Sequence, residues 1–146
     1  AVRPQRVAST LQTVLDNWPR VAPKLAALYD ELNAGRAEGA FALDAATLAA
    51  PLPRAYQWVD GSAYLVHAER VRRSRGAELP KSAYADPLMY QGGSDTMLGP
   101  RDDIQLADDQ SWGIDFEAEI VAITDDVRMG AAAEEAAGRI RLLGLV

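Results

Sequence analysis

The stretch FEAEIVAIT, residues 116–124, decides how this chain is interpreted. Apolar and other residues alternate from Ile114 to Thr124, which predicts a β-strand. Glu117 and Glu119 project from the same face of such a strand, with α-carbons about 7 Å apart. Two carboxylates placed in this way can converge on one cation. The alternative is that they mark the solvent-facing side of the strand.

The composition limits the class of protein. A chain of 146 residues with 49% hydrophobic content is enough for one domain or part of one. A net charge of −6 without a cationic block argues against a nucleic-acid partner. No apolar run approaches the ~18 residues of a membrane span, and the N-terminus lacks the features of a signal peptide, so we expect no membrane contact.

Cysteine is absent from the sequence, and both ends of the chain have an unusual composition. Zero cysteines exclude disulfides and thiolate metal sites and fit a reducing compartment, so we expect a cytoplasmic protein. The chain begins with Ala1 rather than methionine and ends in the apolar run 142–146, which has no polar tail. We therefore expect a fragment of a longer protein.

Residues 1–50 have the pattern of a helical N-terminal segment. Ser9, followed three residues later by glutamine, has the spacing of a capping box at the start of a helix. A second helix is expected with Pro23 in its first turn and Gly35 at its end. Asp44 predicts a short helix after it.

Residues 51–146 mix short helices with extended segments. Ser62 is expected to cap a helix that ends at Gly76. Prolines and glycines divide 79–106 into short extended pieces suited to binding loops. After the strand with the two glutamates, a helix over about 131–139 leads into a terminal strand, and the fold class is therefore α+β.

Several short motifs in this second part occur in a characteristic order. They are Pro51-Leu52-Pro53, Ala63-Tyr64 followed by His67, Leu98-Gly99-Pro100 followed by Asp102-Asp103-Ile104, Asp115-Phe116-Glu117-Ala118-Glu119, and Glu134-Glu135-Ala136 before Ile140. In this order they resemble the fumarylacetoacetate hydrolase family. The resemblance implies that 51–146 form the first part of a mixed, rolled β catalytic domain, placed after the helical segment 1–50.

The resemblance also implies a divalent cation, Mg, Mn or Ca, held by three carboxylates. Two of them carry over to Glu117 and Glu119, and the third is an aspartate that would follow Val146. A hard cation takes six or more oxygen ligands, so two glutamates alone would bind it weakly. We therefore expect an enzyme in the complete protein and an incomplete, inactive chain as given.

His67 is the only histidine, hence the only side chain with an unperturbed pKa near neutrality. By resemblance it is the catalytic base that orients and deprotonates water. Glu69 is the nearest candidate acid, although two residues along a helix direct it to a different side. The alternative for His67 is an ordinary half-buried histidine packed beside Tyr64.

Tyr90 and Gln91 precede two glycines that would let a backbone approach a ligand. Relatives use this region to contact substrate oxygen atoms, so the resemblance assigns both residues to substrate binding, with Tyr90 as a hydrogen-bonding group. A plain turn tyrosine is the alternative.

The activity implied by the resemblance is metal-dependent hydrolysis of a carbon–carbon bond. The substrate would be a small 1,3-dicarbonyl acid of the acylpyruvate type, cleaved through a metal-stabilised enolate. The resemblance further implies a role in aromatic catabolism and a homodimer. The same chemistry also serves decarboxylases, isomerases and hydratases, and a non-catalytic interaction fragment is the alternative of a different class.

Overall fold

A computed structural model of the chain describes residues 1–106 and 116–146. Its described elements are, in chain order, α1 (Leu11–Asp16), α2 (Trp18–Asn33), η1 (Ala45–Thr47), β1 (Val59–Ser62), α3 (Leu65–Ser74), η2 (Lys81–Tyr84), β2 (Leu88–Gln91), β3 (Ile120–Thr124), α4 (Ala133–Ala137) and β4 (Ile140–Leu145). The helices of the N-terminal part precede two small antiparallel sheets, β1 with β2 and β3 with β4. The predicted α+β class is confirmed.

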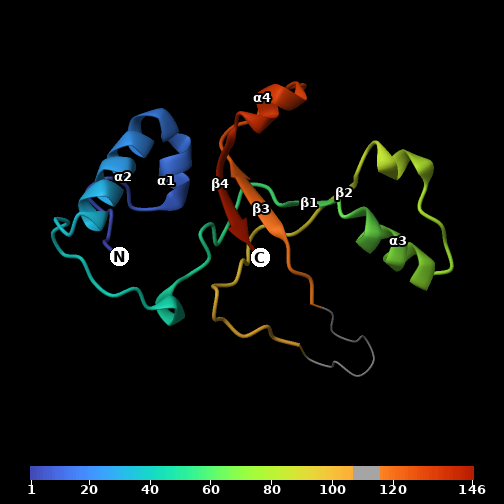
Figure 1. Cartoon of the computed structure of the whole chain (residues 1–146), viewed down its shortest axis with the longest axis horizontal. Coiled ribbons are helices and arrows are strands. Elements are labelled where there is room, and N and C mark those ends of the chain that lie inside the picture. Colours follow the sequence, from blue (N-terminus) through green and yellow to red (C-terminus); the bar gives the residue numbers. More distant parts are fainter. Residues whose placement is uncertain (107–115) are drawn as a thin grey trace.

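The described elements form separate groups along the length of the molecule and do not pack around a common core. Figure 1 shows α1 and α2 at one end, the β3–β4 pair in the middle and α3 at the other end. The chain exposes 12002 Å², whereas a compact monomer of its mass exposes about 7,300 Å². Burial is therefore local to each group of elements.

The start of α1 differs from the expectation by one residue. Thr10, and not Ser9, is the cap, because its Oγ1 accepts the backbone N–H of Thr13 at 3.1 Å. The capping-box prediction at Ser9 was wrong. Both residues can serve as caps, and the choice depends on which one takes the extended backbone conformation before the helix.

Helix α2 begins earlier than predicted. Pro19 occupies its first turn, where a missing N–H costs nothing, and Pro23 lies inside the helix instead of in the first turn. The end was predicted correctly, because Gly35 has a φ of 70°, which a glycine adopts without strain. Asp44 caps η1 by accepting the N–H of Ala46 at 3.0 Å, and the short helix after it is confirmed.

The helical pair contains a small core of its own. Its buried residues are Ala8, Val14 and Val21, with Val7, Leu11, Trp18 and Leu25 packed against them. This core joins α1 to α2, and it explains why the apolar spacing of the first third predicted helices correctly.

The helix predicted after Ser62 is confirmed as α3, but Ser62 belongs to strand β1 and does not cap it. Ser62 is the last residue of β1 and lies opposite Leu88 of β2. The helix begins at Leu65 without a side-chain cap. The cap prediction was wrong because the pairing partner of β1 is distant in sequence, and its own sequence VDGS has little apolar alternation. Gly76, with a φ of 67°, ends the helix region as predicted.

The strand with the two glutamates is shorter than predicted. β3 begins at Ile120, although Glu119 still exchanges two backbone hydrogen bonds with Val146, of 2.7 and 3.0 Å. The expected residues 114 and 115 lie outside the described residues. The alternation of faces and the terminal strand β4 are confirmed. Helix α4 is also shorter than the predicted 131–139.

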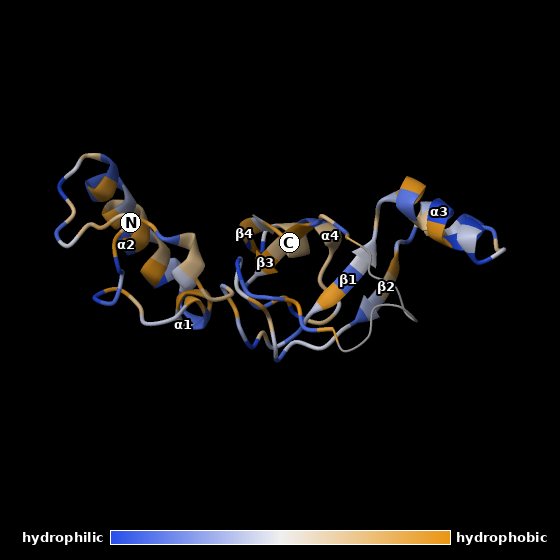
Figure 2. Ribbon diagram, turned by 90° about the horizontal axis from the view of Figure 1, so that it is seen from below, coloured by the Kyte–Doolittle hydropathy of each residue, from blue (hydrophilic) through white to orange (hydrophobic). Residues whose placement is uncertain are grey.

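The two faces of the β3–β4 pair differ in exposure. Val121 and Ile123 are partly buried, as is Glu119 on the same side. Ile120 on the other side is 62% exposed and its partner Leu145 is 87% exposed. Figure 2 shows this pair largely in orange, the colour of hydrophobic residues. The side that carries Glu119 is therefore the more buried of the two.

Arg141 joins the middle sheet to the helical pair. Its guanidinium lies 5.7 Å from the ring centroid of Trp18, a cation–π contact with α2. The same guanidinium forms an ion pair with Asp125 at 2.6 Å, and the Asp125 side chain is only 11% exposed. A residue of β4 therefore contacts both the end of β3 and the N-terminal helices.

Gly99 holds a second contact between the two parts of the chain. Its N–H donates to the Asp102 carboxylate at 2.6 Å. A β-carbon at this position would lie 2.5 Å from the backbone oxygen of Leu48. The segment around Gly99 therefore packs directly against the connector that follows η1.

Gly99→Ala is expected to destabilise the protein by about 1–3 kcal/mol, because backbone atoms cannot move aside as a flexible side chain can. The melting temperature should fall by about 2–4 °C for each kcal/mol, as measured by circular dichroism. Gly93→Ala is the matched control, since a β-carbon there meets only Asp95 at 3.8 Å. Equal melting temperatures for the two variants would contradict the packing argument.

Candidate active site

The β1–β2 ladder defines one side of the candidate site. Asp60 lies directly opposite Tyr90 in this ladder, and alternation along the strand places Trp58 on the same face as Asp60. The Trp58 and Tyr90 rings meet edge to face, with centroids 5.8 Å apart and planes at 61°. Tyr90 is 56% exposed, so the aromatic pair leaves its ring accessible to a ligand.

The other side of the site joins α3 to the segment before β3. His67 lies in the first turn of α3, and its Nε2 is 3.1 Å from Oε1 of Glu117. The His67 and Glu117 side chains are 47% and 49% exposed, so the pair is reachable from solvent. The structure thus brings the only histidine of the chain into contact with the first glutamate of the Glu-x-Glu motif.

Tyr90 connects these two sides electrostatically. Its pKa is raised above the ordinary 10.0, first by a hydrogen bond with Asp60, then by partial burial and by the negative charges of Asp60, Glu117 and Glu119. Each of these effects favours the neutral phenol over the phenolate. The Tyr90 phenol is therefore subject to the negative charges of Asp60, Glu117 and Glu119.

Asp60 is the residue of this group that the sequence did not indicate. It sits in a short polar strand, and nothing in its local pattern distinguishes it from a surface aspartate. Its position becomes clear only from the register of β1 against β2, which sets it opposite Tyr90. The one available signal was its position shortly before His67 in the chain.

Glu69 has a different partner from the one considered in the sequence. Its carboxylate accepts the hydroxyl of Tyr84 at 2.8 Å. This hydrogen bond raises the pKa of Tyr84, with smaller effects from burial and from the Glu69 charge. The ion-pair partner of His67 is Glu117. A catalytic role for Glu69 stays a prediction.

Gln91 and Tyr90 are consecutive residues of β2, so their side chains point to opposite faces of the strand. Tyr90 shares its face with Asp60, whereas Gln91 lies opposite Val59. A ligand held by Tyr90 on the site face would not meet Gln91 through the same surface of the strand. Substrate binding by Gln91 stays a prediction.

A divalent cation needs several oxygen ligands close together. Within 1–106 and 116–146, no three His, Asp or Glu side chains are close enough together to hold an ion. The chemistry of the donors nevertheless fits, because Glu117 and Glu119 supply the carboxylate oxygens that Mg²⁺, Mn²⁺ and Ca²⁺ prefer. A carboxylate has two oxygens with about four lone-pair sites, so the contact with His67 does not exhaust Glu117 as a ligand.

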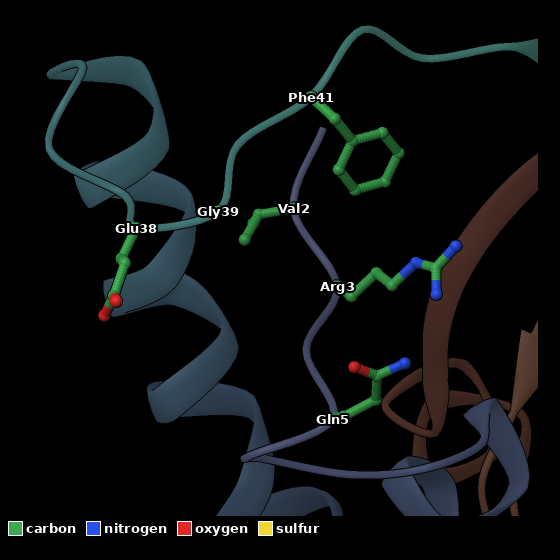
Figure 3. Close-up of a pocket in the computed structure, with 6 residues that line it drawn as sticks. All are labelled: Val2, Arg3, Gln5, Glu38, Gly39 and Phe41. Carbon is green, nitrogen blue, oxygen red and sulfur yellow. The ribbon is translucent and has the colours of Figure 1, made fainter.

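Two shallow hollows lie away from these residues. One lies between the N-terminal residues and the loop after α2 and is lined by Val2, Arg3, Gln5, Glu38, Gly39 and Phe41 (Figure 3). The other is lined by Glu69, Arg73, Ala77, Glu78, Leu79 and Tyr84. Neither hollow contains the pair formed by His67 and Glu117.

Comparison with protein families covers nearly the whole chain. Residues 57–145 match the fumarylacetoacetate (FAA) hydrolase C-terminal model, and residues 1–54 match fumarylacetoacetase N-terminal domain 2. The chain belongs to the fumarylacetoacetate hydrolase family. A comparison with curated proteins gave no match.

Membership in the fumarylacetoacetate hydrolase family indicates a metal-dependent hydrolase or lyase that acts on a small molecule. The match over 57–145 includes every residue of the site described above. Across the described part of the chain, no helix has both the length and the apolar character needed to traverse a lipid bilayer.

Asp60→Asn is expected to lower the pKa of Tyr90 toward 10.0, because the variant removes the negative charge that disfavours the phenolate. The difference in ultraviolet tyrosinate absorbance between the protein and its Tyr90→Phe variant measures this pKa. Since the folded-state pKa is raised, the stability that Asp60 and Tyr90 share is present below pH 10.0 and is lost as the pH rises through the higher folded value.

Asp30→Asn is the control for this titration, since Asp30 lies on the exposed surface of α2. An unchanged Tyr90 pKa in Asp60→Asn would show that the two side chains do not interact in solution.

Proposed function

We propose that the complete protein hydrolyses a carbon–carbon bond in a small 1,3-dicarbonyl acid of the acylpyruvate type. The observation that carries the proposal is the 3.1 Å contact between His67 and Glu117. It joins a side chain able to accept a proton at neutral pH to one of the carboxylates that suit a divalent cation. The family match over 57–145 supports the same reaction class.

Glu117 and Glu119 would supply oxygen ligands to the cation, with water completing its coordination. The negative charges of both glutamates act on the same residue, Tyr90, which supports placing them in one site. When bound, the cation supplies stabilisation of the negative charge that develops on the enolate leaving group. We place these residues in a catalytic part over 51–146 that follows the helical segment 1–50, a division supported by the separate family matches to 1–54 and 57–145.

His67 acts as the general base in this proposal. Its Nε2 lies 3.1 Å from Oε1 of Glu117, and in this proposal Nε2 carries the ring proton and donates it toward that carboxylate. In the neutral ring the lone pair is then on Nδ1, and Nδ1 takes the proton from the attacking water. Glu117 thus fixes the tautomer and the orientation of the ring in addition to its role as a ligand.

Tyr90 binds the substrate in this proposal. Because its pKa is raised, the hydroxyl is protonated throughout the neutral range and can donate a hydrogen bond. A carbonyl or carboxylate oxygen of the substrate is the matching acceptor.

On the support of the family resemblance alone, we extend the proposal to a cytoplasmic homodimer that acts in aromatic catabolism.

The proposal is tested by assaying the complete protein with an acylpyruvate and with oxaloacetate, each with added Mg²⁺, Mn²⁺ or Ca²⁺. We expect one water to be consumed for each acylpyruvate, with release of pyruvate and a carboxylic acid, and loss of activity on chelation. Release of carbon dioxide from oxaloacetate without cleavage of the acylpyruvate would replace the hydrolase by a decarboxylase of the same family.

A further inference from the structure

Trp58 and Gly92 face each other at the end of the β1–β2 ladder. The last paired residues there are Val59 and Gln91, and the N–H of Gly92 donates to the carbonyl oxygen of Trp58 at 3.0 Å. The indole therefore belongs to the face of the hairpin that also carries Asp60 and Tyr90.

The indole occupies the space that a side chain at position 92 would need. A β-carbon on Gly92 would lie 2.3 Å from Cε3 and 2.4 Å from Cζ3 of Trp58. These distances are far below van der Waals contact, so no other residue is compatible with this position of the ring. An aromatic side chain that covers a cross-strand glycine is a known device for fixing the geometry of a strand pair.

The same indole contacts the ring of Tyr90 diagonally across the two strands. The edge-to-face arrangement, at 5.8 Å and 61°, is one of the favoured geometries of an aromatic pair. Trp58 therefore restricts the phenol from one side, and Asp60 lies opposite Tyr90 in the neighbouring strand. A tyrosine with 56% exposure would otherwise be free to change rotamer in solvent.

We propose that Trp58 is a positioning residue that fixes the hydroxyl of Tyr90 for a substrate oxygen, and that Gly92 is the glycine its indole requires. The inference rests on the proposed function for the role of Tyr90. In this inference Gly92 is required because it leaves space for the Trp58 indole, and not because it makes the backbone flexible.

Nuclear magnetic resonance of the chain with labelled tyrosine rings tests the arrangement without substrate. The Tyr90 signals are assigned from Tyr90→Phe, and their ring-current shift reports the indole. Gly92→Ala should displace the indole and abolish this shift. Gly61→Ala is the matched control, because it adds a β-carbon to the same hairpin 4.0 Å from Met89 Cγ, an ordinary contact.

A double-mutant cycle then separates the tryptophan from the glycine. Trp58→Ala should abolish the shift, Trp58→Phe should retain a shift of the same sign, and Gly92→Ala should add no further change in the Trp58→Ala background. The inference is overturned if Tyr90 responds equally to Gly92→Ala and Gly61→Ala, or if Gly92→Ala perturbs Tyr90 fully without the indole.

Kinetics of the complete enzyme give the functional readout. Trp58→Ala should raise the KM about fivefold to tenfold, the size expected for one misplaced hydrogen bond, and Trp58→Phe should restore most of it. A KM unchanged in Trp58→Ala, in an enzyme that is active, overturns the positioning role. An inactive wild-type enzyme with the expected ring-current results would instead refute the proposed function and leave the aromatic arrangement standing.

Discussion

His67→Gln is expected to lower the kcat of the complete enzyme by about 10²- to 10⁴-fold, the range typical of a lost general base. Glutamine can still donate an amide hydrogen bond to the Glu117 carboxylate but cannot accept the proton of a water. Steady-state kinetics with an acylpyruvate give the measurement. Metal affinity should change little, because the variant leaves the carboxylate oxygens in place.

Glu69→Gln is the comparison for this variant, since both residues lie on α3. Glu69 is hydrogen-bonded to Tyr84, and we expect a far smaller loss of kcat than in His67→Gln. A loss as large as that of His67→Gln would instead support the catalytic role predicted for Glu69 from the sequence. A kcat within tenfold of wild type in His67→Gln would contradict the assignment of the base.

Glu117→Gln is expected to weaken Mn²⁺ binding by at least about 10- to 100-fold, the range found for residues that merely orient a metal ligand. The variant removes a negative charge from the group of carboxylates and also the charged partner of His67. Isothermal titration calorimetry of the chain gives the affinities.

Glu31→Gln matches this change in charge on the exposed surface of α2. It should leave the affinity for Mn²⁺ unchanged, because long-range surface charges are largely screened at physiological ionic strength. Equal affinities of the Glu117→Gln and Glu31→Gln proteins would remove Glu117 from the metal site.

Local sequence patterns predicted the helices and their ends well. The apolar spacing of the first third gave two helices, and Gly35 and Gly76 end their segments with positive φ as expected. The starts were less predictable, because Ser9 and Ser62 are both suitable caps by residue type. Thr10 caps α1 instead. Ser62 pairs with Leu88 in the β1–β2 ladder, and this pairing between distant residues cannot be predicted from the local sequence.

The candidate site was predictable only in part, for the same reason. Alternation along the strand placed Glu117 and Glu119 on one side, and His67 stood out as the only histidine. The contact between His67 and Glu117 depends on how α3 lies against the segment before β3. Asp60 and Trp58 gain their positions from the register of β1 against β2, which tertiary structure sets.

The most direct test of the whole account uses the single histidine of the chain. Because the imidazole carbon-bound protons of His67 give one set of resonances, small amounts of Mn²⁺ report whether the cation binds beside this ring. We predict that substoichiometric Mn²⁺ broadens these signals, that excess Mg²⁺ restores them, and that Glu117→Gln abolishes the broadening. His67 signals that stay sharp while the chain binds Mn²⁺ would contradict a shared site for the histidine and the two glutamates.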